Sequence, residues 1–221
     1  MINIEVLIIS WSESYAQQID SVQLHCTDEE KERGKKFKKE TDRAAYLLWC
    51  SYIREACSKM IGISPALISI SRDNYGRPFL TDYSNKIDFN ISHSGSKLAI
   101  GISTDGKIGV DLEKIIPIDI REIQKFFTRE EMSYIDHSRT NKTQRLFQVW
   151  TSIEAYSKLL GIGLDKQIKK RIFTLLNKDQ ALIQHAGSPI FVNSFKCNKY
   201  ILSVASKNRN FKVNLNKIDL G

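Results

Sequence analysis

Several kinds of segment and motif are missing from this chain of 221 residues. No apolar run approaches the roughly 18 residues of a membrane span, and Glu5 interrupts the first apolar stretch, so we expect neither a membrane span nor a signal peptide. The four cysteines form no Cys-x-x-Cys and no metal-ligand spacing with the four histidines, which predicts reduced thiols in a cytoplasmic protein. Walker, Gly-x-Gly-x-x-Gly and Gly-x-Ser-x-Gly motifs are absent too, which leaves those chemistries without support.

Acidic residues are fewer than basic ones, 25 against 33, and the net charge of +8 favours an anionic partner. Nucleic acid, a nucleotide cofactor and an acidic protein all satisfy that charge. The densest basic run lies in residues 31–39, where Phe37 is the one aromatic residue. Because no nucleic-acid-binding signature accompanies this run, we interpret it mainly as a solvated helix face and expect no nucleic-acid partner.

Two acidic fragments stand out from the rest of the chain. Residues 107–113 alternate between apolar and other side chains, which is typical of a half-buried strand. This pattern makes Asp111 and Glu113 neighbours on one face. Gly109 on the same face would leave room for a ligand to approach the backbone.

The second fragment belongs to a predicted helix. Apolar residues recur at three- and four-residue spacing from Leu146 to Leu160, and Gly161 suits the end of the helix. Glu154 and Lys158 are four residues apart, so they lie one turn apart on one side of that helix.

If Asp111, Glu113 and Glu154 converge, they need a counter-charge. Two like charges about 4 Å apart repel by roughly 4 kcal/mol at an effective dielectric near 20. Two or three such pairs would rival the roughly 5–15 kcal/mol stability of a whole domain. A cation must therefore lie among them, or some must be protonated. Oxygen ligands suit Mg²⁺ on a substrate's phosphates, and Lys158 would add a second positive charge. In the alternative, the acidic strand is exposed and Glu154 and Lys158 form a surface pair worth about 0.3–0.5 kcal/mol.

Two pairs of segments repeat along the chain. Residues 55–63 and 154–162 are identical at six of nine positions, and residues 97–103 resemble residues 199–205 at a similar offset. Each pair has the same type of element, a helix end in the first and a buried strand in the second. The repeat predicts two similar halves.

We therefore expect an α+β fold built as a pseudo-twofold pair of α+β halves, residues 1–104 and 105–221, with a turn cluster at the junction. The first half has no acidic strand of its own, so we expect one site between the halves. Further elements follow from local patterns, namely strands over 2–10, 87–92 and near 171–176, 190–196 and 199–205, a turn at 75–78, and helices over 28–39, 42–61, 119–126 and 128–137, the last with a capping box from Thr128 and Glu131.

Five motifs in chain order resemble the signatures of the Sfp-type 4′-phosphopantetheinyl transferases. The resemblance runs from Arg33 to about Lys158, and the motifs are Gly76-Arg77-Pro78, Phe89-Asn90-Ile91-Ser92-His93-Ser94, Gly109-Val110-Asp111-Leu112-Glu113-Lys114, Phe126-Phe127 with Glu131, and residues 150–158. No single motif is decisive, but five in sequence are specific. The resemblance implies a two-half fold with the active site between the halves.

The resemblance also implies a reaction. Coenzyme A would donate its phosphopantetheine arm to a serine of an apo acyl or peptidyl carrier protein and leave adenosine 3′,5′-bisphosphate. Asp111, Glu113 and Glu154 would hold Mg²⁺, with Mn²⁺ as the alternative, on the pyrophosphate of coenzyme A. Lys158 would stabilise developing charge and bind the co-substrate, and Glu154, or Glu113 through a water, would accept the serine proton.

The same resemblance assigns the nucleotide end of coenzyme A. His93 and Ser92 would bind the 3′-phosphate region, and Arg77 and Arg33 would make further contacts. Carrier proteins of this kind are acidic, which agrees with the charge of +8. We expect a monomer, because two fused halves already supply a composite site.

The chain departs from the family pattern at three positions. Ile153 replaces a lysine, which predicts a lost phosphate contact with Lys114 as a candidate substitute. Ala45 replaces an arginine, with Arg43 as the candidate substitute, and Trp49 replaces a glycine. Two competing hypotheses remain, a metal-dependent phosphohydrolase or nuclease using the same carboxylates and a non-catalytic nucleic-acid binder using residues 31–39.

Overall fold

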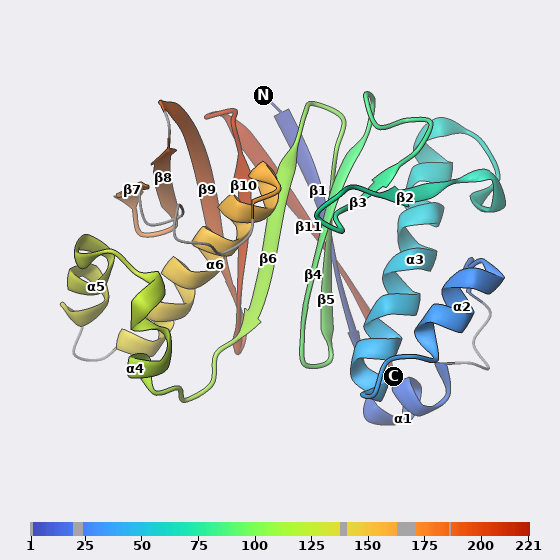
Figure 1. Ribbon diagram of the computed structural model, residues 1–221, viewed down its shortest axis with the longest axis horizontal. Coiled ribbons are helices and arrows are strands. Elements are labelled where there is room, and N and C mark those ends of the chain that lie inside the picture. The colour runs from blue at the N-terminus through green and yellow to red at the C-terminus, as the bar shows by residue number, and fades with distance from the viewer. Residues whose placement is uncertain (1, 20–23, 138–140, 163–170, 186) are drawn as a thin grey trace.

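The computed structural model shows a mixed α+β fold, as the sequence predicts, with β-sheets in the middle and helices grouped at either side (Figure 1). It describes residues 2–19, 24–137, 141–162, 171–185 and 187–221. Among the helices of these described ranges, none has the length and apolarity needed to cross a membrane.

The first sheet joins the two ends of the described chain. Its strands are, in sheet order, β11 (Phe211–Leu220), β1 (Ile2–Trp11), β5 (Lys97–Ser103) and β4 (Asp88–Ser94). β1 pairs with β11 in parallel and with β5 antiparallel. The long helix α3 (Glu40–Ile61) packs on one face of this sheet through a shared apolar cluster, and it ends at Gly62 in the left-handed conformation.

The second sheet is antiparallel throughout. Its strands are, in sheet order, β6 (Ile108–Lys114), β10 (Tyr200–Ser206), β9 (Ser188–Cys197), β8 (Gln180–His185) and β7 (Ile172–Asn177). The second long helix, α6 (Lys142–Leu160), packs on one face of this sheet and ends at Gly161, also left-handed. A small third sheet pairs β2 (Ile70–Arg72) with β3 (Pro78–Leu80).

Shorter helices complete the fold. They are α1 (Glu13–Gln17), α2 (Asp28–Gly34), α4 (Ile120–Ile123), α5 (Arg129–Asp136) and the 3-10 turns Pro65–Leu67 and Gln124–Phe126. The capping box of Thr128 and Glu131 is confirmed at the start of α5, and Thr27 forms another at the start of α2. α2 ends five residues before the predicted boundary at Lys39. Four of those five residues are lysines, whose repulsion at helical spacing opposes further turns.

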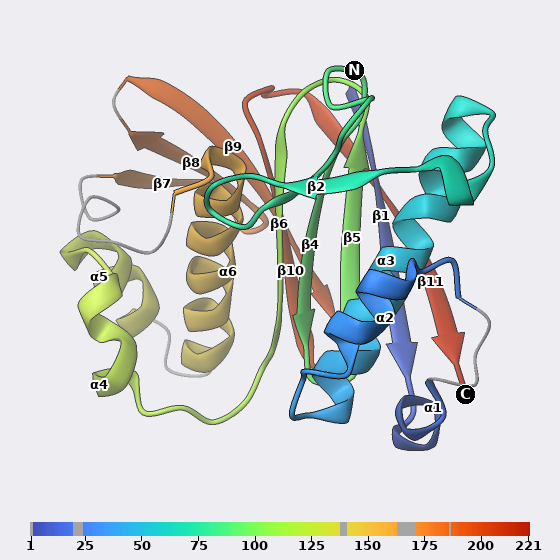
Figure 2. The same cartoon turned by 45° about the vertical axis from the view of Figure 1, so that its right-hand side comes forward.

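An apolar layer between the two sheets orients the acidic strand. Ile4, Val6 and Ile8 of β1 pack in one cluster with the alternate residues Val110 and Leu112 of β6. Because side chains alternate along a strand, the residues between them on β6 face the opposite side, where α6 lies (Figure 2). Because Val110 and Leu112 pack into this layer, Asp111 and Glu113 face α6.

Candidate active site

A cavity of about 440 Å³ lies among α3, the first sheet, β6 and α6. It holds most of the residues that the sequence singled out. Its lining consists of Arg33, Phe37, Asp42, Ala45, Tyr46, Trp49, Arg72, Ile91, Ser92, His93, Leu98, Asp111, Glu113, Glu154 and Lys158. The three predicted carboxylates and Lys158 therefore come together, although they belong to two separate elements.

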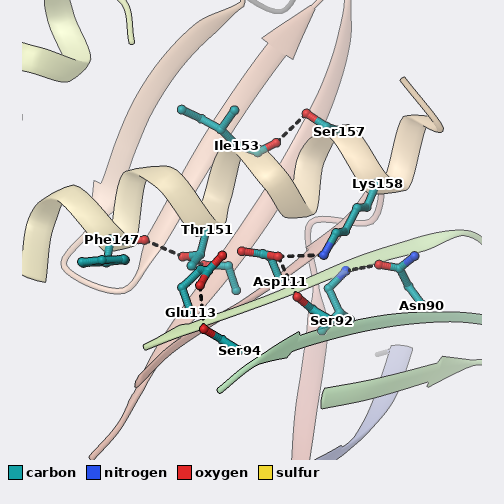
Figure 3. A network of polar contacts seen from close by, with 12 residues as sticks. Asn90, Ser92, Ser94, Asp111, Glu113, Phe147, Thr151, Ile153, Ser157 and Lys158 are labelled. Atoms are coloured by element: carbon teal, nitrogen blue, oxygen red, sulfur yellow. Dashed lines mark hydrogen bonds and ion pairs between the residues drawn. The ribbon is translucent and has the colours of Figure 1, made fainter. Parts of the chain in front are cut away.

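Asp111 is the centre of the acidic side of this cavity (Figure 3). Its side chain is 3% exposed, and its Oδ1 accepts hydrogen bonds from Ser92 Oγ at 2.8 Å and from Lys158 Nζ at 2.7 Å. Its Oδ2 is buried and has no hydrogen-bond partner among the residues that the structure describes. Two residues further along β6, Glu113 accepts a 2.8 Å hydrogen bond from Ser94 Oγ.

The electrostatics of the acidic side favour protonation or a cation. Burial, and then the charge of Asp111, raise the pKa of Glu154 to about 7, against the opposing charge of Lys158. Burial and Asp111 likewise raise the pKa of Glu113, although Ser94 and Lys158 oppose them. At both glutamates, burial and the charge of Asp111 together outweigh the opposing charge of Lys158.

The donor set fits a hard divalent cation by its chemistry. An unpartnered buried carboxylate oxygen on Asp111, together with two carboxyl groups of raised pKa, is the environment that such an ion relieves. Within the described residues, no group of three or more His, Cys, Asp or Glu side chains is already arranged around one metal position. In this structure the Lys158 ammonium is instead the positive charge beside Asp111.

The opposite side of the cavity is basic and aromatic. The Arg33 guanidinium lies 5.8 Å from the centre of the Tyr46 ring, and that of Arg72 lies 5.5 Å from the centre of the Trp49 ring. Both arrangements are cation–π contacts, which hold the two charges at the cavity wall. His93 Nε2 lies 3.3 Å from an Asp42 oxygen at the rim.

Sequence reasoning missed three of these wall residues. Tyr46 and Trp49 are three residues apart in a predicted helix, so their shared face could have been found from spacing. Arg72 had no such signal, because it lies on the short strand β2 outside every motif. Trp49 packs against Phe89 as well, so it fills space where the family pattern has a glycine.

Ser92 and Arg77 make contacts that the resemblance did not predict. Ser92 is 8% exposed, and its hydroxyl is directed to Asp111, although it also lines the cavity beside His93. Arg77 lines a neighbouring cavity of about 330 Å³. Its guanidinium forms an ion pair with Asp88 at 2.8 Å and donates to the backbone carbonyls of Phe89, Ile108 and Lys158.

The interpretation of Gly109 is wrong, and that of Ile153 stays a prediction. A Cβ on Gly109 would lie 1.8 Å from the carbonyl oxygen of Ala155, so the missing side chain admits the backbone of α6 and not a ligand. Ile153 is fully buried in the cluster under α6 and points away from Asp111 (Figure 3). The isoleucine side chain itself therefore contributes nothing to the cavity, and the loss of a phosphate contact here stays a prediction. Ala45 does line the cavity, where it supplies no charge.

Two family models match the chain, one on each side of the turn that follows β5. The model described as "4′-phosphopantetheinyl transferase, N-terminal" matches residues 10–104. The model of the "4′-phosphopantetheinyl transferase superfamily" matches residues 107–205, which include the three carboxylates and Lys158.

Curated relatives point to the same family. A 4′-phosphopantetheinyl transferase from Bacillus subtilis is 26% identical over 202 residues, which are 89% of this chain and 88% of that protein. The Sfp enzyme of Bacillus subtilis strain 168 is 25% identical over 83% of both chains. A putative 4′-phosphopantetheinyl transferase from Synechocystis is 29% identical over 66% of this chain, and the match spans 61% of its length.

The two family models therefore cover the residues that line the cavity. The residues matched by the two family models supply both walls of the cavity, the basic aromatic one and the acidic one. On these findings the chain belongs to the 4′-phosphopantetheinyl transferase superfamily and is an enzyme of that superfamily.

Proposed function

We propose that the protein transfers the 4′-phosphopantetheine arm of coenzyme A to a serine of an apo acyl or peptidyl carrier protein and releases adenosine 3′,5′-bisphosphate. One observation supports this proposal most strongly. Asp111, Glu113, Glu154 and Lys158 share one cavity with a basic aromatic wall, in a chain whose relatives carry the name of this transferase.

The two walls of the cavity suit the two ends of a pyrophosphate co-substrate. Arg33, Arg72 and His93 offer positive charge or hydrogen-bond donors for an anionic nucleotide end. Lys158 lies at the acidic wall, where it would contact the pyrophosphate. Arg77 would support this wall indirectly, because its guanidinium holds the backbone of Lys158.

Asp111, Glu113 and Glu154 would hold Mg²⁺, with Mn²⁺ as the alternative ion. When bound, the ion would neutralise charge that develops on the pyrophosphate oxygens. Its arrival would also give the buried Asp111 Oδ2 a partner and lower the pKa values that burial has raised.

Glu154 is our candidate for the general base, with Glu113 as the alternative. Its carboxylate lines the cavity on α6, one turn before Lys158, where an ionised carboxylate beside the pyrophosphate can accept a proton from the serine. In the proposed step the serine oxygen forms a bond to the phosphorus that bears the pantetheine arm, and the bond from that phosphorus to the bridging oxygen breaks. The serine proton passes to Glu154, and Lys158 stabilises charge on the departing oxygen.

The pseudo-twofold division into residues 1–104 and 105–221 is also part of this proposal. The repeated segments 55–63 and 154–162 occupy the equivalent C-terminal ends of α3 and α6. The segments 97–103 and 199–205 fall on the buried strands β5 and β10. The last strand, β11, would then be exchanged into the sheet of the first half, where it lies beside β1.

The partner of the proposed reaction is an acidic carrier protein. The net charge of +8 and the basic run at residues 31–39, beside the wall that holds Arg33, would steer such a protein to the cavity. That the enzyme is a monomer, acts in the cytoplasm and binds no nucleic acid stays a prediction from the sequence.

The proposal is tested by incubating the protein with coenzyme A, Mg²⁺ and a panel of apo carriers, followed by mass spectrometry of the carriers. We expect one carrier to gain a single phosphopantetheine arm, with no gain in EDTA or with Asp111→Ala. If no carrier gains mass and coenzyme A does not bind, the proposal is wrong. Metal-dependent cleavage of coenzyme A or nucleic acid without a carrier would instead support a hydrolase, and salt-sensitive nucleic-acid binding that survives Asp111→Ala would support a binding protein.

A further inference from the structure

The edge strands β4 and β6 lie side by side where the two sheets meet (Figures 1 and 2). β4 is the last strand of the first sheet and β6 the first strand of the second, so neither continues the backbone ladder of the other. Polar side chains from every second residue of β4 bridge the two strands instead. We call this row of four, Asp88, Asn90, Ser92 and Ser94, the β4–β6 seam.

Each contact of the seam joins residues 19 or 20 positions apart in the chain. Asp88 Oδ2 accepts from the Ile108 amide at 2.8 Å, and Asn90 Oδ1 accepts from the Val110 amide at 2.7 Å. Because this offset stays at 19 or 20 along two strands that run in the same direction, the contacts define one alignment of β6 along β4.

At the C-terminal end of β4, the same row reaches the carboxylates themselves (Figure 3). Ser92 Oγ donates to Asp111 Oδ1 at 2.8 Å. Ser94 Oγ donates to Glu113 Oε2 at 2.8 Å and accepts from the amide of Lys114 at 3.1 Å. One strand of the first half therefore holds both acidic residues of β6.

We propose that the β4–β6 seam sets the register of β6 and thereby aims Asp111 and Glu113 at the cavity, with Asn90 and Ser94 as positioning residues for the transfer reaction. The catalytic part of this inference rests on the proposed function. Asn90 is 4% exposed and acts through the Val110 amide. Ser94 acts through the Glu113 carboxylate and the Lys114 amide.

The physical reason lies in the alternation of β6. A slip of one residue would turn Val110 and Leu112 toward the cavity and put Asp111 and Glu113 into the apolar layer between the sheets. Backbone pairing with β10 holds one edge of β6. On the other edge, the amides of Ile108, Val110 and Lys114 bond to side-chain acceptors of the seam, and that of Val110 is buried and needs such an acceptor.

The experiment uses variants with matched controls elsewhere in the first sheet. Asn90→Ala removes the acceptor of Val110. Its control is Asn214→Ala, which removes an amide that links β11 to Glu5 of β1 at 2.6 Å, away from the seam. Ser94→Ala removes the hydroxyl that holds Glu113, whereas Ser94→Thr keeps a hydroxyl at the same position.

Two readouts distinguish positioning from general destabilisation. The first is amide hydrogen exchange at Val110 and Lys114 by NMR, measured without substrates and at a temperature where all variants are folded. The second is the separate measurement of kcat and of KM for coenzyme A. For Asn90→Ala we expect at least about tenfold faster exchange at Val110 and a ten- to hundredfold lower kcat, with KM changed less than about threefold.

The conservative pair gives an independent test if Asn90→Ala fails to fold. We expect Ser94→Ala to speed exchange at the Lys114 amide and to lower kcat about tenfold, and we expect Ser94→Thr to return both to their wild-type values. Asn214→Ala should change neither readout.

An unchanged kcat and unchanged exchange at Val110 in a folded Asn90→Ala would overturn the inference, and so would an equal loss in Asn214→Ala. If the wild-type protein transfers but these variants transfer equally well, the positioning role fails and the proposed function stands. If the wild-type protein transfers nothing, the proposed function and the catalytic role of the seam both fail, and exchange at Val110 still decides whether the seam sets the register.

Discussion

Glu154→Gln should stabilise the metal-free protein at alkaline pH while it removes the proposed base. The Glu154 carboxyl lies beside Asp111 in the cavity, and its pKa is raised to about 7 by burial and by that neighbour. Glutamine has nearly the same shape and carries no charge at any pH. The substitution therefore removes the electrostatic penalty and preserves most of the packing.

The size and the pH window of this effect follow from the pKa. In the unfolded chain Glu154 titrates near 4.5, so between about 4.5 and 7 the folded protein keeps a proton that the unfolded chain has lost. The free energy of unfolding must then fall as the pH rises through this window. The penalty is absent below about 4.5 and complete above about 7. At about 1.36 kcal/mol per pKa unit it amounts to roughly 3 kcal/mol, or about 2 kcal/mol after allowance for the partly exposed side chain.

The assay is urea unfolding in EDTA at pH 4.5 and pH 8. We expect the two proteins to be nearly equal in stability at pH 4.5, and the glutamine variant to be more stable by about 2–3 kcal/mol at pH 8. Added Mg²⁺ should narrow the gap at pH 8 by stabilising the wild-type protein. A gap that is the same at both pH values, or a variant that is less stable at pH 8, would refute the reasoning.

Three further substitutions test other parts of the account. Asp111→Asn should lower transfer by at least about a hundredfold while the circular dichroism spectrum stays that of the folded protein, because it removes a proposed metal ligand; transfer within threefold of wild type would contradict the site. Arg77→Ala should lower the free energy of unfolding by roughly 3 kcal/mol in urea titration, because it leaves the Asp88 carboxylate without its ion pair; a loss under 1 kcal/mol would show that water replaces the guanidinium. Glu131→Gln should lower the free energy of unfolding by about 3–5 kcal/mol in the same assay, because the Arg171 guanidinium that it pairs with is fully buried; a urea midpoint equal to wild type would contradict this expectation.

The parts of the fold that the sequence predicts well are those where a periodic pattern and a local end signal coincide. The helix ending at Gly161 combines a three- and four-residue apolar repeat with a left-handed terminal glycine. The acidic strand was predicted from alternation, and its burial exceeds that prediction because α6 covers the face that carries Asp111. Local periodicity cannot report which element packs on a strand face.

Two of the strands that were missed have different explanations, and long-range pairing accounts for β11. β11 alternates between apolar and polar residues, but its Lys/Asn-rich composition hid the pattern, and its partner β1 lies about two hundred residues earlier. β8 is short and lies between β7 and β9, where two hairpins define it. β11 is a strand because β1 offers it a backbone edge, and that information is not local.

In the candidate site too, residues with a local pattern were predicted, and residues placed by long-range contacts were not. The carboxylates and Lys158 could be named from spacing, because a strand and a helix each place two of them on one face. Arg77 could not be placed, since its partners include three backbone carbonyls, which have no signature in the sequence. Its motif correctly marked the neighbourhood of the site, but the side chain holds elements together and lines another cavity.

The most direct test of the central claim is the mass of an apo carrier protein after incubation with this enzyme, coenzyme A and Mg²⁺. The account predicts a gain of one phosphopantetheine arm, matched mole for mole by released adenosine 3′,5′-bisphosphate and lost with Asp111→Asn. Carriers of unchanged mass across acyl and peptidyl types, with a folded and metal-loaded enzyme, would contradict it.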